Sequence, residues 1–352
     1  MKSEVKCNVS EFIIQGFTDI PQLQAPMIGF FLCIYLLIMC GNLTIVVVIW
    51  STSRLHTPMY IFLVNLSFID IASTSNILPN LLVILCTKEK TISFVGCITQ
   101  MYVFVSLSCV EFILLSAMAY DRYVAICHPL HYFSLMPLRL SAVLSFGSWF
   151  VGFLDPVGHA VFISNLCFCS DYYLDHFFCD ITPLLKISCT DTSHVNMLNY
   201  VEGTLIGITA FMLTLISYIL IISVILKIKS IEGQRKAFST CTAHLTCVCL
   251  FYGTILCLYM RPTSSFSPKQ DKYFSLLYLA LLPMFNPVIY SLKNEDVKQV
   301  LLPTAPLVTP QLLTAAPVTP QLHTAAPASP VATPETPPAS PEAAPESPPA
   351  SH

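Results

Sequence analysis

The sequence is poor in charge. Asp, Glu, Lys and Arg together make up 11% of its 352 residues, whereas a soluble domain carries about 25%. Hydrophobic residues make up 55% of the chain. A soluble protein of this composition would expose much of its apolar surface to water. The scarcity of charge therefore excludes an ordinary soluble domain and favours a membrane protein surrounded by lipid.

An excess of positive charge is lacking too. The formal net charge is −3 at pH 7, and a surface that binds nucleic acid is strongly basic. Nucleic acid is therefore excluded as a partner.

The patterns of an enzyme or a transporter are also missing. The nine histidines are scattered along the chain, and no nucleophile and base converge in a catalytic pattern. The apolar part has no internal repeat and no continuous path of charges of the kind that transporters use. We therefore predict no enzymatic activity and no cofactor, apart from the structural ion considered below.

What the sequence has in abundance is long apolar runs. A helix that crosses a hydrocarbon core of roughly 30 Å needs about 20 mostly apolar residues. Seven segments meet this requirement, at about 26–50, 58–85, 98–120, 140–163, 197–226, 238–260 and 273–292. We predict an all-α membrane protein, with a seven-transmembrane helix bundle at 26–302. Residues 1–25 are too polar for a cleavable signal peptide, so the first span serves as its own signal anchor.

The composition changes abruptly after Leu302. Residues 303–352 are almost wholly Pro, Ala, Thr, Ser and Glu and hold 14 of the 26 prolines, and VTPQLLTAAP at 308–317 recurs as VTPQLHTAAP at 318–327. Prolines this dense supply neither helix donors nor core-forming side chains. We predict a disordered, partly polyproline tail, which suits either a spacer or a docking segment for aromatic-lined modules.

An odd number of spans places the two termini on opposite sides of the membrane. The lysines and arginines divide nine to eight between the two faces, which is too even for the positive-inside rule to decide. A glycosylation sequon at Asn8 favours an outside amino terminus. We therefore predict a multi-pass plasma-membrane protein with an extracellular N-terminal segment at 1–25 and a cytoplasmic tail at 303–352.

Cysteines support the same orientation. Five of them fall on the face of the amino terminus, at Cys97, Cys167, Cys169, Cys179 and Cys189. Such clustering suits an oxidising, extracellular side, although sequence alone permits several pairings. Span six carries four others, and there Cys241 and His244 have a metal-compatible spacing. We interpret that pair as packing residues.

Two kinds of charge stand inside or beside the apolar runs. Cys97 and Arg122 are 25 residues apart, about 37 Å along a helix, so Asp121 and Arg122 reach the inner boundary. Asp70 and Glu111 share a depth of roughly 16 to 18 Å from that boundary. Two carboxylates in a low dielectric cannot both stay charged without a cation or a proton. We expect a sodium ion or a shared proton there, or else a purely structural hydrogen-bond network, with Asn42, Ser108 and Asn286 beside the two acids.

Several motifs, taken together, carry a family resemblance. The third span ends in MAYDRYVAICHPLHY at 118–132, span two begins with LHTPMYIFLVNLSFID at 55–70, and span six opens with KAFSTCTAHL at 236–245. The outer loop holds HFFCD at 176–180, and the last span closes with PMFNPVIYSLKNEDVK at 283–298. In this order they resemble the odorant receptors within the rhodopsin-like, G-protein-coupled receptors, over roughly residues 8 to 300. Residues 303–352 have no counterpart in that pattern.

The resemblance implies a function and a set of partners. Such a receptor binds a small odorant and activates a heterotrimeric stimulatory G protein of the olfactory type, which raises cyclic AMP. The sequence does not distinguish this role from that of a chemosensor of the same fold that detects a metabolite outside the nose.

The resemblance also implies structural pairs and a switch. The implied disulfides are Cys97–Cys179 and Cys169–Cys189, and Cys167 has no predicted disulfide partner. The switch toward the G protein comprises Asp121, Arg122, Tyr123, Tyr218, Asn286, Pro287 and Tyr290. Asp121 would hold Arg122 in the resting state, and Pro287 would provide a hinge because proline removes a backbone hydrogen bond. An acid at the inner end of span six, which many relatives have, is absent, and Glu232 is the nearest candidate.

A ligand pocket is expected in the outer half of the bundle. One face of span three follows a spacing of three and four residues, and it carries Phe104, Val105, Ser108, Cys109 and Phe112. The family resemblance assigns further pocket residues to spans five to seven, namely Gly203, Ile206, Gly207, Tyr252, Ile255, Tyr259, Leu276 and Tyr278. This lining suits a small, mostly apolar ligand with one polar group, although the same stripes also suit ordinary helix packing. No Lys or Arg lies there, which disfavours a carboxylate ligand, whereas His159 and Glu202 suit an amine or a heterocycle.

Overall fold

The structure is a computed structural model, and it describes residues 9–17, 21–87, 90–168, 172–259, 268–293, 297 and 300. Three parts of the predictions lie outside the described residues: the sequon at Asn8, Cys169 and the tail at 303–352. The backbone of Tyr259 is described but its side chain is not.

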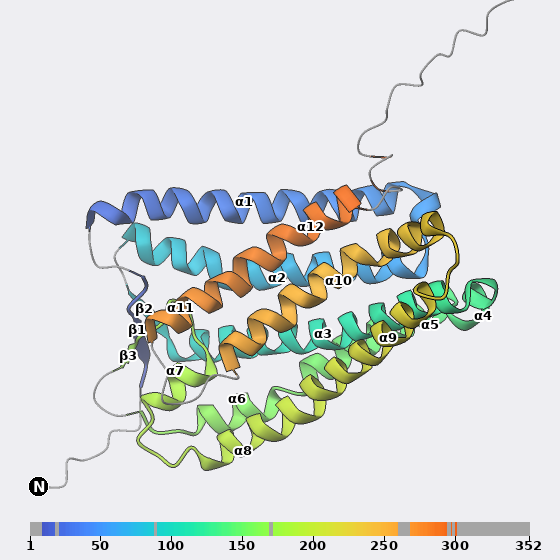
Figure 1. Cartoon of the computed structure of the whole chain (residues 1–352). Coiled ribbons are helices and arrows are strands. Elements are labelled where there is room, and N and C mark those ends of the chain that lie inside the picture. The colour runs from blue at the N-terminus through green and yellow to red at the C-terminus, as the bar shows by residue number, and fades with distance from the viewer. Residues whose placement is uncertain are drawn as a thin grey trace, which may run out of the picture. The chain divides into compact units, whose positions relative to one another are not determined.

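Long helices make up most of the chain and run side by side (Figure 1). They are α1 (Pro21–Ser51), α2 (Pro58–Thr87), α3 (Phe94–Cys127), α5 (Leu138–Leu154), α6 (Val157–Ser164), α8 (Ser193–Glu202), α9 (Thr209–Ile225), α10 (Ile231–Tyr259), α11 (Pro268–Leu276) and α12 (Leu282–Lys293). Shorter helical turns are η1 (Ser53–Leu55), η2 (Pro129–His131), α4 (Tyr132–Leu135), α7 (Ile181–Lys186), η3 (Gly203–Ile208) and η5 (Leu277–Leu281).

Among the described residues, six helical stretches are long and apolar enough to cross a membrane. The seventh span is α10, whose halves Ile231–Ser239 and Cys241–Leu256 meet at an angle of 49°. The predicted fold class, a seven-helix membrane bundle, is therefore confirmed.

Polarity in the bundle is arranged for lipid rather than for water. Large apolar side chains such as Trp50, Val47 and Phe146 are exposed on the outer faces of the helices, whereas Asn42 and Asp70 are buried inside. A hydrocarbon solvent requires this arrangement, because apolar side chains suit lipid and polar groups need partners within the protein.

The helix boundaries differ from the predicted spans in instructive ways. Span three was expected to end at residue 120, but α3 continues to Cys127, so Asp121 and Arg122 lie inside the helix rather than beyond it. A helix satisfies its own backbone hydrogen bonds, so it does not have to stop where the apolar run stops. Span four is interrupted at Asp155 and Pro156, between α5 and α6, where proline supplies no N–H group.

Two spans contain a stretch of π-helix. In span five this stretch is η3, directly after Glu202, and in span seven it is η5, which contains Tyr278. Such wide turns often occur at functional sites, because they shift the register of the side chains that follow. The hydrophobic pattern of these spans gives no sign of them.

A small sheet covers one end of the bundle (Figure 1). Strand β1 (Glu11–Ile14) pairs antiparallel with β2 (Thr91–Ser93) and parallel with β3 (Tyr173–Leu174). Phe12 and Ile14 are fully buried beneath it and pack with Phe168 and Leu174. The N-terminal segment, expected only to be extracellular, is thus tied to the start of α3 and to the loop after α6.

The loop between α6 and α8 is also tied to α3 covalently. A disulfide joins Cys97 of α3 to Cys179, with their Cα atoms 5.4 Å apart, and it is the first of the two pairs that the resemblance implies. Beside it, the backbone N–H of Cys179 donates to Gln100 Oε1 at 2.9 Å. Cys189 is also disulfide-bonded, and so is Cys167, which the predicted pairing left over.

Helices α3 and α5 approach each other closely at Gly152. A Cβ atom added there would lie 2.4 Å from Val110 Cγ2 and 2.8 Å from the Val110 backbone nitrogen. Small residues permit such approaches between membrane helices. The position of α5 against α3 therefore depends on the missing side chain.

Replacing Gly152 with alanine should lower the free energy of unfolding by about 1–3 kcal/mol, because the new methyl group has to displace backbone. Gly147→Ala is the matched control on the same helix, since a Cβ there meets nothing within 4 Å. Thermal unfolding of the purified protein in detergent measures both variants. Equal melting temperatures for the two would contradict the close approach.

Candidate functional site

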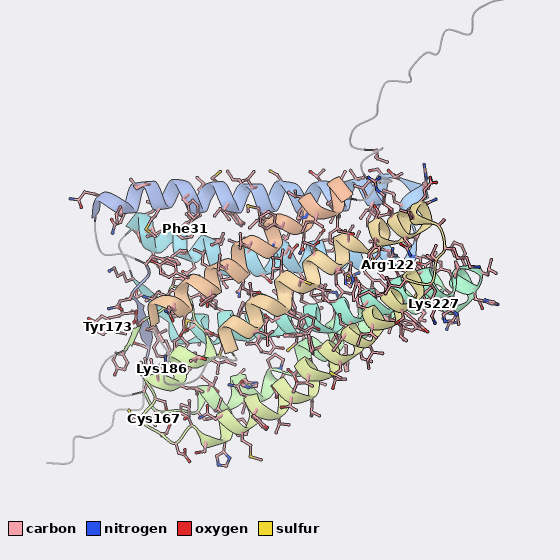
Figure 2. The ribbon with its side chains drawn as sticks, in the orientation of Figure 1. Phe31, Arg122, Cys167, Tyr173, Lys186 and Lys227 are labelled. Atoms are coloured by element: carbon pink, nitrogen blue, oxygen red, sulfur yellow. A yellow bond between two sulfur atoms is a disulfide. The ribbon has the colours of Figure 1, made fainter. Side chains whose placement is uncertain are left out.

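The two ends of the bundle carry different polar groups. Figure 2 places Cys167, Tyr173 and Lys186 at the end with the sheet, and Arg122 and Lys227 at the opposite end. We call these the sheet end and the arginine end. The candidate site consists of a polar layer at the arginine end, a middle polar layer, an aromatic layer toward the sheet end, and a lateral cluster.

At the arginine end, Asp121 and Arg122 form a buried ion pair. Arg122 Nε donates to Asp121 Oδ2 at 2.9 Å, and its Nη2 contacts the same oxygen. Asp121 is fully buried and Arg122 is 8% exposed. The pair is therefore held away from solvent, as the resemblance implies for the resting state.

A third residue, Tyr132 of α4, completes this layer. Its hydroxyl donates to Asp121 Oδ1 at 2.7 Å, so both carboxylate oxygens of Asp121 are engaged. Burial, and then the adjacent Asp121 carboxylate, raise the pKa of Tyr132, which keeps its hydroxyl protonated as a donor. The sequence analysis did not select Tyr132, although it stands inside the motif quoted at 118–132.

The other predicted switch residues are distributed around this layer. Tyr123 OH lies 3.1 Å from His128 Nε2, away from the ion pair. Tyr218 is buried and its hydroxyl lies 2.7 Å from His244 Nδ1, while Tyr290 is fully buried. His244, interpreted from sequence as a packing residue, is fully buried and is also a hydrogen-bond partner of a switch residue.

The middle layer contains the two acids of the bundle interior. Asn286 Nδ2 donates to both carboxylate oxygens of Asp70, at 2.9 and 3.2 Å. Tyr278 OH donates to Glu111 Oε2 at 3.0 Å and lies 3.1 Å from Ser108 Oγ. The equal depth inferred from helix rise is matched in space, because Asp70 and Glu111 line one small cavity together with Ser73.

Asn42 has other partners in the structure. Its side-chain nitrogen donates to the backbone oxygens of Ile38 and Pro283, at 3.1 and 3.0 Å. It therefore fixes α1 against α12 and makes no hydrogen bond to either acid. The expected place of Asn42 beside the carboxylates is not matched by a direct contact.

The cavity between the acids is about 10 Å³ in volume, which is about the space that one water molecule needs. Its polar lining offers carboxylate, hydroxyl and phenol oxygens, the ligand type that hard cations prefer. These residues fit a small monovalent cation in chemistry and in scale.

Toward the sheet end the bundle is filled with aromatic rings. Phe104 packs edge-to-face on Phe178 at 5.0 Å and on Tyr278 at 5.9 Å, while Phe112 packs on Phe251 at 4.7 Å and on Tyr252 at 5.8 Å. The structure thus brings together four of the predicted pocket residues. Partly buried Val105, Ile255 and Leu276 pack against the same core.

Other predicted pocket residues lie to one side. His159 Nδ1 is 2.9 Å from Glu202 Oε2, and Cys109 Sγ is 3.2 Å from Asp155 Oδ2. We call these four residues the lateral cluster. On the following turn, Ile206 and Gly207 are partly buried and Gly203 is exposed.

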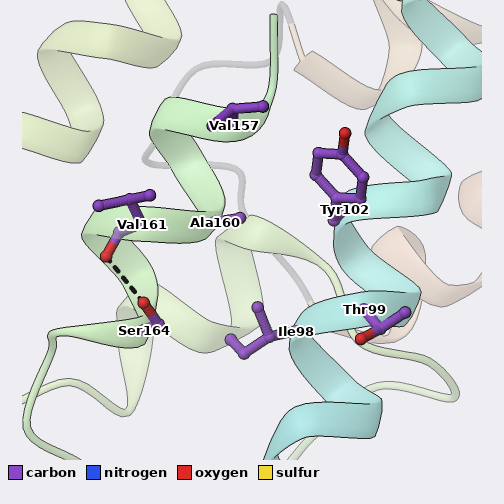
Figure 3. A pocket seen from close by; sticks show the side chains of 7 residues that line it. All are labelled: Ile98, Thr99, Tyr102, Val157, Ala160, Val161 and Ser164. Atoms are coloured by element: carbon purple, nitrogen blue, oxygen red, sulfur yellow. Dashed lines mark hydrogen bonds between the residues drawn. The ribbon is translucent and has the colours of Figure 1, made fainter. Parts of the chain in front are cut away.

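A larger hollow of about 410 Å³ lies between α3 and α6 (Figure 3). It is lined by Ile98, Thr99, Tyr102, Val157, Ala160, Val161 and Ser164, none of which was predicted for the pocket. Tyr102 OH donates to the backbone oxygen of Phe153 at 2.6 Å, and Ser164 Oγ donates to that of Val161 at 2.9 Å. With two of its three hydroxyl groups engaged in these bonds, this hollow presents mainly apolar surface.

The sheet end is closed by the outer loop and the start of α11. Lys272 Nζ lies 2.6 Å from Asp175 Oδ1 and donates to the Gly16 backbone oxygen at 2.9 Å. Next to this contact, His176 is 3% exposed and stacks on Phe177. Burial first, and the Lys272 charge second, lower the pKa of His176 to about 3.

Taken together, these features define a class of protein: a seven-span receptor with a buried Asp–Arg pair at one end and a disulfide-tied loop at the other. A family profile described as olfactory receptor matches residues 31–304. The chain belongs to the olfactory receptor family, a family of G-protein-coupled receptors that are not enzymes. The predicted family is confirmed, and the match ends where the proline-rich tail begins.

Individual relatives agree with this assignment. Mouse (Mus musculus) olfactory receptor 5AR1 is 46% identical over 298 residues, which cover 85% of this chain and 96% of the relative. Human (Homo sapiens) olfactory receptor 1C1 is 45% identical over 291 residues, or 83% and 93% of the two chains. Rat (Rattus norvegicus) olfactory receptor 1f45 is 43% identical over 301 residues, or 86% and 96%.

The buried His176 predicts a pH dependence of stability. Its folded-state pKa of about 3 lies below the ordinary 6.5, so its neutral ring stabilises the fold fully above pH 6.5, and this contribution is lost as the pH falls toward 3. The stability difference between the wild type and His176→Gln should therefore shrink by about 1.4 kcal/mol per pH unit below pH 6.5.

Melting temperatures of both proteins at several pH values test this dependence. Burial raises the pKa of Asp180 to about 6, so this carboxyl group favours the folded state as the pH falls. Both proteins contain Asp180, so its effect cancels in the stability difference. His194→Gln, at an exposed histidine, is the control. A difference that does not change with pH would refute the assignment.

Proposed function

We propose that this receptor binds a small, mostly apolar odorant in the outer half of its helix bundle and activates a stimulatory G protein of the olfactory type. Activation raises cyclic AMP. In this proposal the sheet end faces the exterior and the arginine end faces the cytoplasm. The orientation is supported by the disulfide-bonded cysteines at the sheet end, because disulfides persist in oxidising compartments.

The observation that carries the proposal is the arrangement around Arg122. Its charge is held inside the bundle by Asp121, and Asp121 is held in turn by Tyr132. A buried ion pair breaks at a large cost unless its charges gain new partners. A G protein at this end can supply a new partner for Arg122. Arg122 then has two alternative states, one paired with Asp121 and one paired with the G protein.

The ligand site is proposed at the aromatic layer. Its rings come from α3, α10 and η5 and from the outer loop, so a ligand among them contacts several spans at once. Tyr278 links this layer to Glu111 in the middle layer, and Phe112 packs on Tyr252 of α10, the helix that also carries His244. A ligand that moves these rings can therefore bias the arginine end through α10 and α12.

Replacing Arg122 with alanine should abolish the cyclic AMP response to every active member of an apolar odorant panel, because the proposed contact with the G protein is lost. The assay uses cells that express an olfactory-type G protein, and surface labelling checks that the variant reaches the membrane. Arg139→Ala, at an exposed arginine in α5, should respond like the wild type. Full signalling by Arg122→Ala at normal surface level would disprove the switch.

We further propose that the cavity between Asp70 and Glu111 holds a sodium ion in the resting state, or a proton shared by the two acids. When bound, sodium would supply positive charge that permits both carboxylates to stay ionised in a low dielectric. Asp70, Glu111 and Ser73 are the residues that would hold it, and the oxygen atoms of the polar side chains in the lining support this choice.

The ion hypothesis predicts a salt-specific stability. At a sodium concentration ten times its Kd, bound sodium would add about 1.4 kcal/mol to the free energy of unfolding, and Asp70→Asn should remove this gain. Melting temperatures are compared in sodium chloride and in choline chloride at equal ionic strength. Asp191→Asn, at an exposed acid, should keep the sodium effect. A wild type that melts alike in both salts would leave the shared proton as the account of this pair.

A further inference from the structure

The lateral cluster joins four side chains from three spans. Cys109 lies on α3, Asp155 lies between α5 and α6, His159 lies on α6, and Glu202 is the last residue of α8. The Cys109 thiol donates to Asp155 Oδ2 at 3.2 Å, and His159 Nδ1 lies 2.9 Å from Glu202 Oε2. Asp155 and His159 stand only four residues apart in span four, which brings the two contacts near each other.

The cluster has more negative than positive charge available. Two carboxylates face a single imidazole, and no Lys or Arg forms a salt bridge with either acid within the described part of the chain. The two acids and His159 lie within spans four and five, where an unbalanced charge is costly. A bound cation or an added proton is needed to balance the charge of the cluster.

His159 provides a second, independent indication of a missing partner. Its side chain is 2% exposed, yet neither ring nitrogen makes a hydrogen bond of ordinary geometry in the structure. The short distance from Nδ1 to Glu202 is a contact without hydrogen-bond alignment. A buried polar group left in this state is destabilising, and a donor placed between the ring and the acids would satisfy it.

Space for such a donor exists beside Glu202. The next residue, Gly203, opens the π-helical turn η3, and a Cβ atom added at Gly203 or at Gly207 would meet nothing within 4 Å. The side chains of Asp155 and Glu202 are only partly buried. A ligand can therefore approach the acids along this turn without displacing a packed side chain.

We infer that Asp155 and Glu202, with His159 between them, form a recognition site for the ammonium group of a small amine odorant. The ammonium would donate to the two carboxylates and to the imidazole, and the apolar body of the amine would extend toward Phe112 of the aromatic layer, three residues after Cys109 on α3. This inference rests on the proposed function and narrows its ligand class. A divalent metal is a poorer occupant, because the described residues contain no group of three or more His, Cys, Asp or Glu that could hold a metal ion.

Direct binding tests the head group separately from signalling. The melting temperature of the purified receptor is titrated with hexylamine, hexanol and hexanoic acid, which share one chain, and with phenethylamine and phenethyl alcohol. Each amine should reach half of its effect at a concentration about tenfold or more below that of its alcohol, since charged hydrogen bonds are about twice as strong as neutral ones. Hexanoic acid should have the weakest effect.

Variants then locate the site. Glu202→Gln and Asp155→Asn, each measured separately, should remove most of the preference for amines and leave the binding of the alcohols unchanged. Asp191→Asn is the matched control and should keep the preference. If one variant does not fold, the other alone tests the site, because both acids contact the same ammonium in this inference.

Two results would overturn the inference. One is that the amines stabilise the wild type no better than the matched alcohols, and the other is that the preference survives in both variants. Failure of the proposed function has a different signature: alcohols or amines stabilise the purified receptor, but no odorant raises cyclic AMP in cells. Preferential binding of amines that depends on the two acids supports the site whether or not the coupling assay succeeds.

Discussion

Hydrocarbon offers no hydrogen bonds, so a polar group inside a bilayer depends on partners within the chain. This constraint accounts for where the charges of the bundle lie. Arg122 is held by Asp121 at one end, and Asp70 is held by Asn286 in the middle. The outward surfaces of the helices are left to apolar side chains, and the spans are arranged around these internal contacts.

The same constraint separates structural pairs from functional ones. Asn42, bound to two backbone carbonyls, has satisfied its donor and fixes two helices. The acids of the middle layer accept hydrogen bonds, but neither they nor the acids of the lateral cluster form a salt bridge with a Lys or Arg among the described residues, and they lie beside the π-helical turns η5 and η3. A buried charge without a counter-charge costs stability, and it is where a ligand or an ion has free energy to contribute.

Much of this arrangement follows from the sequence, because apolar runs fix the spans and helix rise fixes depth. The shared depth of Asp70 and Glu111 and the place of Arg122 at the inner boundary were deduced in this way. Rotation about each helix axis and contacts between distant segments have no comparable local signal. Tyr132, His244 and Asp155 were missed as partners for that reason, and the sheet was missed because its strands lie far apart in the sequence.

The central claim is that the chain crosses the membrane seven times, with the arginine end in the cytoplasm. The most direct measurement is antibody access to two peptide tags, one before Met1 and one after His352, on intact and on permeabilised cells. The account predicts that the first tag is labelled on intact cells and the second only after permeabilisation. Labelling of the second tag on intact cells would contradict it.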